Sequence, residues 1–221
     1  MRCVRIWFDK TGEIKYISHL DLMRCFTRAI RRAKIPLWFT EGFNPRPYMQ
    51  FALPLSLGMQ SVCESVDIRI EGEISNTEIL KRLKNAMPSG ITVKSITEPV
   101  FDPKKIAFGE FDITFSLASD TDKLKKLIED TLLSDEIIVE KLGKKGRQKV
   151  MKEINLKEYI SSSELRVKNG DVICSLILPA GCTTNINPSL FSDKICGLSG
   201  ENLAVDIVRK RLMIENGEDF K

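Results

Sequence analysis

The chain has 221 residues, of which 43% are hydrophobic and 29% are charged, a composition typical of globular proteins that argues against wholesale disorder. No apolar run is long enough to span a bilayer, and the first ten residues, MRCVRIWFDK, lack the apolar core of a signal peptide, so we expect a cytoplasmic protein without a membrane partner. The net charge of +4 is concentrated in residues 1–100, which carry 15 Lys and Arg against 10 Asp and Glu, and a polyanion should be attracted to that half.

A strand and an amphipathic helix begin the chain. Residues 2–8 alternate as a strand does, and a turn at 9–12 follows. Ser18, with Asp21 three residues later, resembles a capping box and marks the start of a helix that Pro36 ends. Apolar residues recur at helical spacing, at Leu22, Phe26, Ala29, Ile30 and Ala33. Arginines occupy the other side of this helix, at Arg24, Arg28, Arg31 and Arg32.

The segment after Pro36 predicts a stiff loop. A short extended piece at 37–40 leads to EGFNPRPY at 41–48, where Gly42 permits a positive φ and two prolines restrict the backbone. The loop carries Phe43, Asn44, Arg46 and Tyr48. Cationic groups beside aromatic rings suit a polyanion that carries bases, so we predict that the arginine helix and the loop form one RNA-binding recess. The alternative is that the arginines form only a solvated face.

The remaining elements predict an α+β fold. An interrupted extended segment at 48–57 and a strand at 65–71 are followed by a helix at 76–87 and a strand at 91–96. This completes a β-α-β-β-α-β order, and residues 98–105 read as a linker. In the second half we expect strands at 110–117 and 136–142, helices at 122–133 and 188–196, a hairpin around Asn169-Gly170, and a strand or helix end at 207–214. We therefore predict two ferredoxin-like units in tandem, at 1–98 and 106–221, of which the second is degenerate.

Three other groups of residues each allow two interpretations. A basic loop at 143–149, with Lys144, Lys145 and Arg147, either adds phosphate contacts or is a solvated hairpin tip. His19, the only histidine, is either a general acid or base or a polar neighbour of the helix start. The acids Glu64, Asp67 and Glu71 either bind a divalent ion or are exposed on the polar side of a strand.

Several kinds of chemistry lack their motifs in this sequence. It contains no GxxxxGK[ST] loop, no GxGxxG after a strand and no HExxH. Its six cysteines form no CxxC pair, which favours buried free thiols over zinc or iron–sulfur ligands. We therefore expect no cofactor and no metal, and an enzymatic activity is less favoured than a binding role.

The run from Ser18 to Ile70 resembles an uncharacterised bacterial family linked to radical SAM enzymes. The match includes the SHLD helix start, the arginine helix, the EGFNPRP loop and the LPLSLG segment, in this order. Members of that family stand alone or form the C-terminal part of proteins with cobalamin-binding and radical SAM modules. Their neighbourhood with radical SAM enzymes, an RNase of the E/G type and ribosomal protein genes implies work on RNA or on the ribosome.

This resemblance implies a function without naming a reaction. The chain has no CxxxCxxC motif, so any radical chemistry would come from a partner. We predict a non-catalytic RNA-binding or substrate-presenting module that acts with a radical SAM enzyme in tRNA, rRNA or ribosome-related modification. The alternatives are a metal-independent, single-histidine ribonuclease resembling the tandem ferredoxin-like CRISPR RNA-processing nucleases, and a protein–protein adaptor for a radical SAM partner. The oligomeric state stays open.

Overall fold

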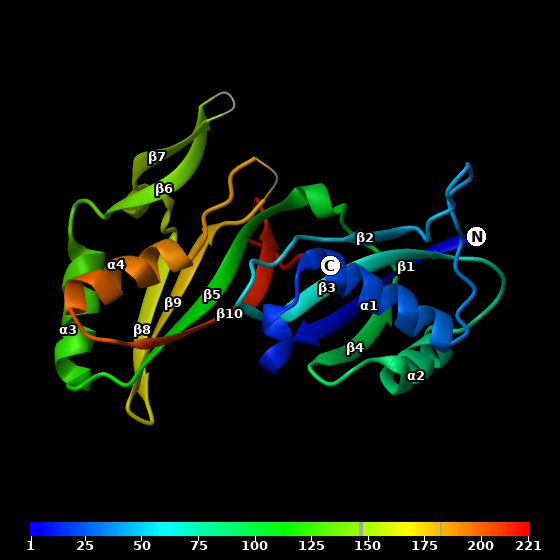
Figure 1. Cartoon of the computed structure of the whole chain (residues 1–221), viewed down its shortest axis with the longest axis horizontal. Helices are drawn as coiled ribbons and strands as arrows, with labels where there is room; N and C mark the ends of the chain where they lie inside the picture. Colours follow the sequence, from blue (N-terminus) through cyan, green and yellow to red (C-terminus); the bar gives the residue numbers. More distant parts are fainter. Residues whose placement is uncertain (146–147, 182) are drawn as a thin grey trace. The chain divides into compact units, whose positions relative to one another are not determined.

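The chain folds into two compact units. A computed structural model describes residues 1–145, 148–181 and 183–221 (Figure 1), and within these ranges it has four α-helices together with its strands. The first unit comprises Met1–Ile106 and Arg211–Lys221, and the second comprises Ala107–Lys210. The sequence predicts a second domain at 106–221, whereas Arg211–Lys221 belongs to the first unit.

The first unit is a four-stranded antiparallel arrangement with two helices. Its elements are β1 (Arg2–Lys10), η1 (Gly12–Tyr16), α1 (His19–Arg32), β2 (Met49–Phe51), β3 (Gln60–Ile70), α2 (Asn76–Ala86), β4 (Ile91–Thr97) and η2 (Pro103–Lys105). The strand order is β4-β1-β3, and β2 pairs with the free edge of β3, so each of these neighbours is antiparallel. The element order is the β-α-β-β-α-β order expected for residues 1–98.

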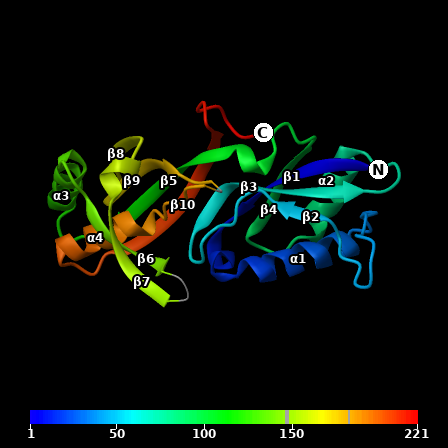
Figure 2. The ribbon, with the colours of Figure 1, turned by 90° about the horizontal axis from the view of Figure 1, so that it is seen from above.

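The predicted start and buried face of the arginine helix are confirmed. The Ser18 side chain caps α1 by accepting a hydrogen bond from the Asp21 backbone N–H at 3.1 Å. The predicted apolar positions are buried at Leu22, Phe26, Ala29, Ile30 and Ala33. They pack with α2 against one face of the sheet, and Figures 1 and 2 show α1 running along that sheet.

Alternation along the strands gives this sheet two different faces. In β1, Val4, Ile6 and Phe8 belong to the core beneath the helices. In β3, Ile68 and Ile70 do the same, so Arg69 between them points to the opposite face. Because successive side chains of a strand alternate, Arg5 shares that helix-free face with Arg69.

The second unit contains a sheet and a separate hairpin. Its elements are β5 (Ile106–Ser116), α3 (Thr121–Leu133), β6 (Ile138–Lys145), β7 (Gln148–Asn155), η3 (Leu156–Tyr159), β8 (Ser162–Lys168), β9 (Asp171–Pro179), α4 (Ser189–Ser199) and β10 (Ala204–Ile214). The first residue of β5 and the last residues of β10 are counted with the first unit. The strand order is β10-β5-β9-β8, while β6 and β7 pair only with each other. Helices α3 and α4 lie next to each other in both views (Figures 1 and 2).

In the second unit the structure confirms the predicted hairpin, decides between strand and helix at 207–214, and adds a strand that was not predicted. The hairpin is confirmed, because Lys168 pairs with Asp171, and Asn169 and Gly170 both have positive φ. The segment at 207–214 is a strand, part of β10. Strand β7 was not predicted, since its charged sequence QKVMKEIN carries a weak apolar signal. No helix within the described ranges is long and apolar enough to cross a bilayer.

Candidate nucleic-acid interface

The predicted arginines of α1 do not all point toward the loop. Arg24 pairs with Asp21 on the surface of the same helix, with Nη1 and Oδ1 3.0 Å apart. Arg32 donates a hydrogen bond to the Ala86 carbonyl at the end of α2, where it lines a hollow of about 360 Å³ with Lys34 and Arg82. These two arginines therefore serve local contacts, away from the loop.

Arg28 and Arg31 remain available on the exposed side of the helix. Both are exposed, and neither side chain makes a hydrogen bond or an ion pair with any residue that the structure describes. The guanidinium carbon of Arg31 lies 5.9 Å from the ring centroid of Phe39, which packs against the core below the helices. Arg31 therefore borders the helix side of the segment that leads into the loop.

The loop at 41–46 is the tip of a hydrogen-bonded hairpin. At its base the Thr40 N–H donates to the Arg46 carbonyl at 2.8 Å, and the Arg46 N–H donates to the Thr40 hydroxyl at 3.0 Å. The Trp38 N–H donates to the Arg69 carbonyl at 2.9 Å and so attaches the hairpin to β3. Phe43 at the tip is fully exposed, and Gly42 takes the φ of +130° that favours glycine.

Asn44 and Arg46 belong to the same exposed tip. The Arg46 guanidinium makes no hydrogen bond or ion pair within the described part of the chain. Because the hairpin base is fixed by backbone hydrogen bonds, Arg46 is presented on a supported loop rather than on a free one.

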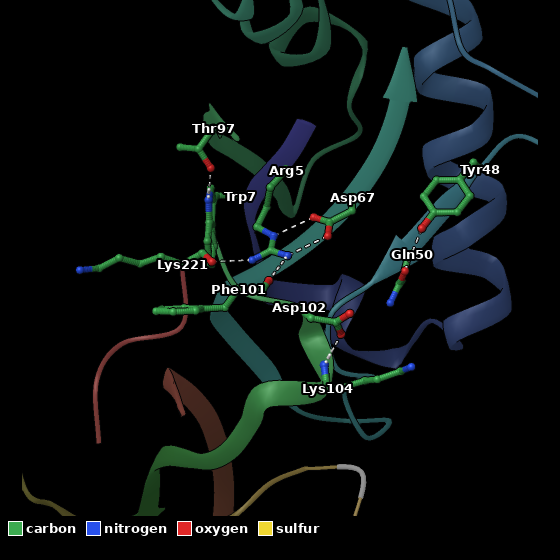
Figure 3. Close-up of polar contacts among 10 residues, drawn as sticks. All are labelled: Arg5, Trp7, Tyr48, Gln50, Asp67, Thr97, Phe101, Asp102, Lys104 and Lys221. Atoms are coloured by element: carbon green, nitrogen blue, oxygen red, sulfur yellow. Dashed lines mark hydrogen bonds and ion pairs between the residues drawn. The ribbon is translucent and has the colours of Figure 1, made fainter. Parts of the chain in front are cut away.

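Tyr48 lies on the helix-free face beside Trp38 and Arg69, which the sequence does not mark as site residues. The guanidinium carbon of Arg69 is 4.2 Å from the Tyr48 ring centroid and 5.3 Å from the Trp38 ring centroid. The two rings are 6.4 Å apart, with their planes at 60°. The Tyr48 hydroxyl donates to Gln50 Oε1 at 3.0 Å (Figure 3), and we call Trp38, Tyr48, Gln50 and Arg69 the Arg69 cluster.

The predicted recess is therefore divided between two faces. Phe39 and Arg31 lie on the helix side of the edge segment, whereas Trp38, Tyr48 and Arg69 lie on the opposite side. The physical reason is strand alternation, since residues 37–40 and 47–51 are extended and adjacent side chains point to opposite faces. Arg31 and Arg69 therefore lie on opposite faces of this edge and do not share one pocket.

The acids predicted as exposed or metal-binding are buried in part. Asp67 is buried, and both of its carboxylate oxygens accept hydrogen bonds from Arg5 at 2.7 Å (Figure 3). Glu64 is also buried, and only Glu71 is exposed. The reading of Asp67 and Glu64 as exposed acids is wrong, and within the described ranges no cluster of three metal-ligating side chains occurs.

His19 packs against the edge strand β2 at the other end of α1 from Arg31. It is half-buried, and its ring lies 5.2 Å from the Phe51 ring in an edge-on contact. It is twelve residues from Arg31 on the same helix, which separates them by roughly 18 Å along the axis. The two therefore do not share a site.

The basic loop at 143–149 stays a prediction. Arg147 lies outside the described residues, and the side chains of Lys144 and Lys145 do too. Only their strand is described, in which Lys144 pairs with Lys149 across the β6–β7 hairpin.

Comparison with solved structures indicates a fold likeness. A chain from the "Crystal Structure of a Cbf5-Nop10-Gar1 Complex" aligns with a TM-score of 0.51 and 11% identity, over 95% of this chain and 48% of the other. This chain thus spans about half the length of that one, and at such low identity the likeness concerns the fold alone. A heavy metal efflux pump aligns with a TM-score of 0.22 and 12% identity, over 94% of this chain and 28% of that one, which carries no argument.

Sequence comparison identifies the family. No curated protein matches the sequence significantly. A family model described as "Uncharacterized protein conserved in bacteria (DUF2344)" matches residues 3–188, which include α1, the loop at 41–48 and the Arg69 cluster. Because the match covers most of the chain, this protein belongs to that bacterial family.

Proposed function

We propose that this protein is a non-catalytic RNA-binding or substrate-presenting module of the cytoplasm that acts with a radical SAM enzyme in tRNA, rRNA or ribosome-related modification. The observation that carries the proposal is a set of exposed arginines on α1 and on the loop at 41–46 of the first unit. Arg28, Arg31 and Arg46 are exposed there without carboxylate partners among the described residues. Phosphates can occupy such guanidinium groups without first displacing an acid.

The aromatic residues of the edge favour RNA as the polyanion. Phe43 is fully exposed at the tip of a loop that is braced by backbone hydrogen bonds. When an unpaired base stacks on an exposed ring, the apolar surface of the ring is removed from water. Proteins that bind single-stranded RNA of many sequences rely on such stacking.

A non-catalytic role is supported by the position of the single histidine and by the lack of a radical SAM cluster motif. His19 packs against Phe51 of β2 and lies far along α1 from Arg31. The sequence has no CxxxCxxC motif, so a radical reaction on a bound RNA would be supplied by a partner enzyme. The link to that partner rests on the family resemblance.

We also infer that both units are variants of the ferredoxin-like fold. In the first unit the antiparallel order β4-β1-β3-β2 supports this. In the second, the order β10-β5-β9-β8 repeats the pattern, with the β6–β7 hairpin inserted after α3. Since this fold hosts many activities, it supports the architecture and no particular function.

Salt-dependent RNA retention tests the proposed function. A labelled tRNA or rRNA pool should bind at low salt, and affinity should fall steeply as salt rises. The double variant Arg28→Ala/Arg31→Ala should weaken binding strongly and reduce the slope of log affinity against log salt by about 0.7 per lost single-strand phosphate contact. The matched control is Lys81→Ala/Lys84→Ala, which removes the same charge from the exposed side of α2.

The same experiment separates the alternatives. If the two double variants weaken binding equally, net charge rather than the edge is responsible, and the site is rejected. If the wild type retains no RNA but captures a purified radical SAM enzyme after nuclease treatment, the protein is an adaptor instead.

A further inference from the structure

The guanidinium of Arg69 is held in place without using its hydrogen-bond donors. The Tyr48 and Trp38 rings contact it at 4.2 Å and 5.3 Å from their centroids, while no described residue accepts a hydrogen bond from its side chain. Stacking against rings orients the guanidinium plane and leaves its N–H edge directed elsewhere. The N–H donors of Arg69 are therefore available to an anion.

Three other half-buried or buried arginines of this protein use their donors internally. Arg5 donates to Asp67, Arg2 donates to the Ile74 carbonyl, and Arg166 donates to Asp112 and Ser175. Desolvating a guanidinium without a hydrogen-bond acceptor is costly, so structural arginines are normally paired in this way. Arg69 departs from that pattern: its donors have no acceptor among the described residues, yet none of them is fully buried, so they are open to an acceptor from outside the chain.

The fold removes the acid that would otherwise pair with Arg69. Asp67 lies two residues before Arg69 on the same face of β3, and Arg5 occupies both of its oxygens. Cys3 lies directly opposite Arg69 in the β1–β3 register. Burial raises the pKa of the Cys3 thiol and Asp67 adds to this rise, so no thiolate compensates Arg69 at neutral pH. Among the described residues no carboxylate forms an ion pair with Arg69, Glu71 two residues after it included.

Gln50 adds a second donor to the same cluster. The Tyr48 hydroxyl donates to Gln50 Oε1, and Figure 3 shows the amide nitrogen pointing away from the ring. The amide NH2 of Gln50 therefore remains a hydrogen-bond donor. It lies on the helix-free face, because Gln50 pairs with Asp67 in the β2–β3 register and Asp67 lies on that face. A guanidinium, an amide donor and two half-exposed rings thus occur together.

We infer that the Arg69 cluster binds one nucleotide step of single-stranded RNA, with the guanidinium of Arg69 on a backbone phosphate and the Trp38 and Tyr48 rings against the adjoining sugar and base. This inference rests on the proposed function and gives it a defined subsite on the face opposite to Arg31. A guanidinium can bind a phosphate through two parallel hydrogen bonds, and rings beside it stack on bases of any sequence. A carboxylate would satisfy Arg69 as well but would leave the aromatic surface without a matching group.

The test is binding of a labelled oligouridine by the full chain, with variants at Arg69. Arg69→Gln should weaken binding by roughly tenfold or more, because a charge-assisted bidentate contact is lost. Arg69→Lys should preserve the salt slope yet bind several-fold more weakly than the wild type, because an ammonium has no planar fork. The slope should fall by about 0.7 in Arg69→Gln. Lys81→Gln is the control of equal charge.

A second measurement uses the wild type and therefore does not depend on whether a variant folds. The Arg69 side-chain Nε–H resonance, assigned by its loss in Arg69→Lys, should shift when the dinucleotide UpU is added to the wild type. A deoxyribose oligonucleotide and a poly-glutamate peptide serve as competing ligands. Equal Arg69-dependent binding of the peptide would overturn the RNA assignment in favour of an acidic protein partner.

The outcomes distinguish this subsite from the proposed function. If RNA binding depends on Arg28 and Arg31 but Arg69→Gln binds like the wild type, the subsite is wrong and the proposed function stands. If the wild type binds neither the RNA pool nor oligouridine, both are wrong. Binding lost in Arg69→Gln and retained in Lys81→Gln, with the resonance shift, supports both.

Discussion

Arg5 and Asp67 form a buried bidentate ion pair across strands β1 and β3, with both nitrogen–oxygen distances at 2.7 Å. The same guanidinium donates to the carbonyls of Phe101 and Lys221 (Figure 3). It also lies 4.4 Å from the Phe220 ring centroid. One side chain thus attaches the segment after β4 and the end of the described chain to the sheet. It also keeps Asp67 from pairing with Arg69.

Replacing Arg5 should destabilise the first unit strongly. In Arg5→Met the Asp67 carboxylate would remain buried without its partner, which typically costs about 3–5 kcal/mol of the free energy of unfolding. Urea unfolding measures the loss, and limited proteolysis should cut near residues 98–102 and 211–221. The control Arg24→Ala breaks only an exposed pair and should cost no more than about 1 kcal/mol. Equal losses in both variants would contradict the role given to Arg5.

Ser18→Ala should weaken α1 and change the titration of Asp21. Loss of the cap should lower the free energy of unfolding by about 1 kcal/mol. Hydrogen bonds from the Ser18 hydroxyl and from Arg24 lower the pKa of Asp21 below its ordinary 3.8. The associated stabilisation is complete above pH 3.8 and is lost as pH falls through the lower pKa of the folded state.

Carboxyl NMR measures that prediction directly. The pKa of Asp21 should rise toward 3.8 in Ser18→Ala, and the pKa of Glu78, which Arg82 lowers, should not change. An unchanged Asp21 titration would show that the hydroxyl does not hydrogen-bond the carboxylate in solution.

Cys174 should resist alkylation until the second unit unfolds. Burial raises the pKa of this thiol to about 12. Its contribution to stability is complete below the ordinary pKa of 9.0 and is lost as pH rises through the folded value. With iodoacetamide at mildly alkaline pH, peptide mapping should find Cys196 modified well before Cys174 in the native protein and both modified at similar rates in urea. Rapid native labelling of Cys174 would contradict its buried position.

Phe43→Ala should leave stability unchanged and weaken RNA binding. The ring is fully exposed and contributes little to the core, so urea unfolding should match the wild type. Loss of one stacked base would cost about 1–3 kcal/mol of binding free energy. Fluorescence anisotropy with a short single-stranded RNA measures this, and Leu133→Ala, at another exposed apolar residue, is the control. Equal binding by both variants would remove Phe43 from the interface.

Local signals made the helix at 19–32 predictable, whereas the site depends on contacts that are distant in sequence. The Ser18 cap and the spacing from Leu22 to Ala33 act within a few residues, and each is present in the structure. The contact between Arg5 and Lys221 joins opposite ends of the described chain, and no periodic pattern in the sequence predicts it. A spacing argument therefore could not assign the terminal segment to the first unit.

The Arg69 cluster was missed although its signal was present. In SVDIRI the alternation places Arg69 opposite to the apolar positions, and Trp38 and Tyr48 lie in extended segments. What the sequence could not show is that these segments pair at one sheet edge, which brings the two rings onto Arg69 and separates Tyr48 from Arg31. The arginine helix stands out in the sequence by its charge density, whereas a single arginine that contacts two rings from other segments does not.

His19→Ala should reduce stability slightly and leave RNA intact. The edge-on contact with Phe51 is worth about 0.5–1.5 kcal/mol beyond the buried area, and that is the loss expected in urea unfolding. Because the imidazole is roughly 18 Å along α1 from Arg31, it cannot serve as the acid or base for a phosphodiester held there. Labelled RNA incubated with the wild type or with His19→Ala in EDTA should show the same fragments on a denaturing gel. Cleavage that occurs with the wild type and stops in His19→Ala would instead establish the single-histidine ribonuclease, because only loss of a catalytic imidazole separates the two proteins while Arg28, Arg31 and Arg69 are unchanged.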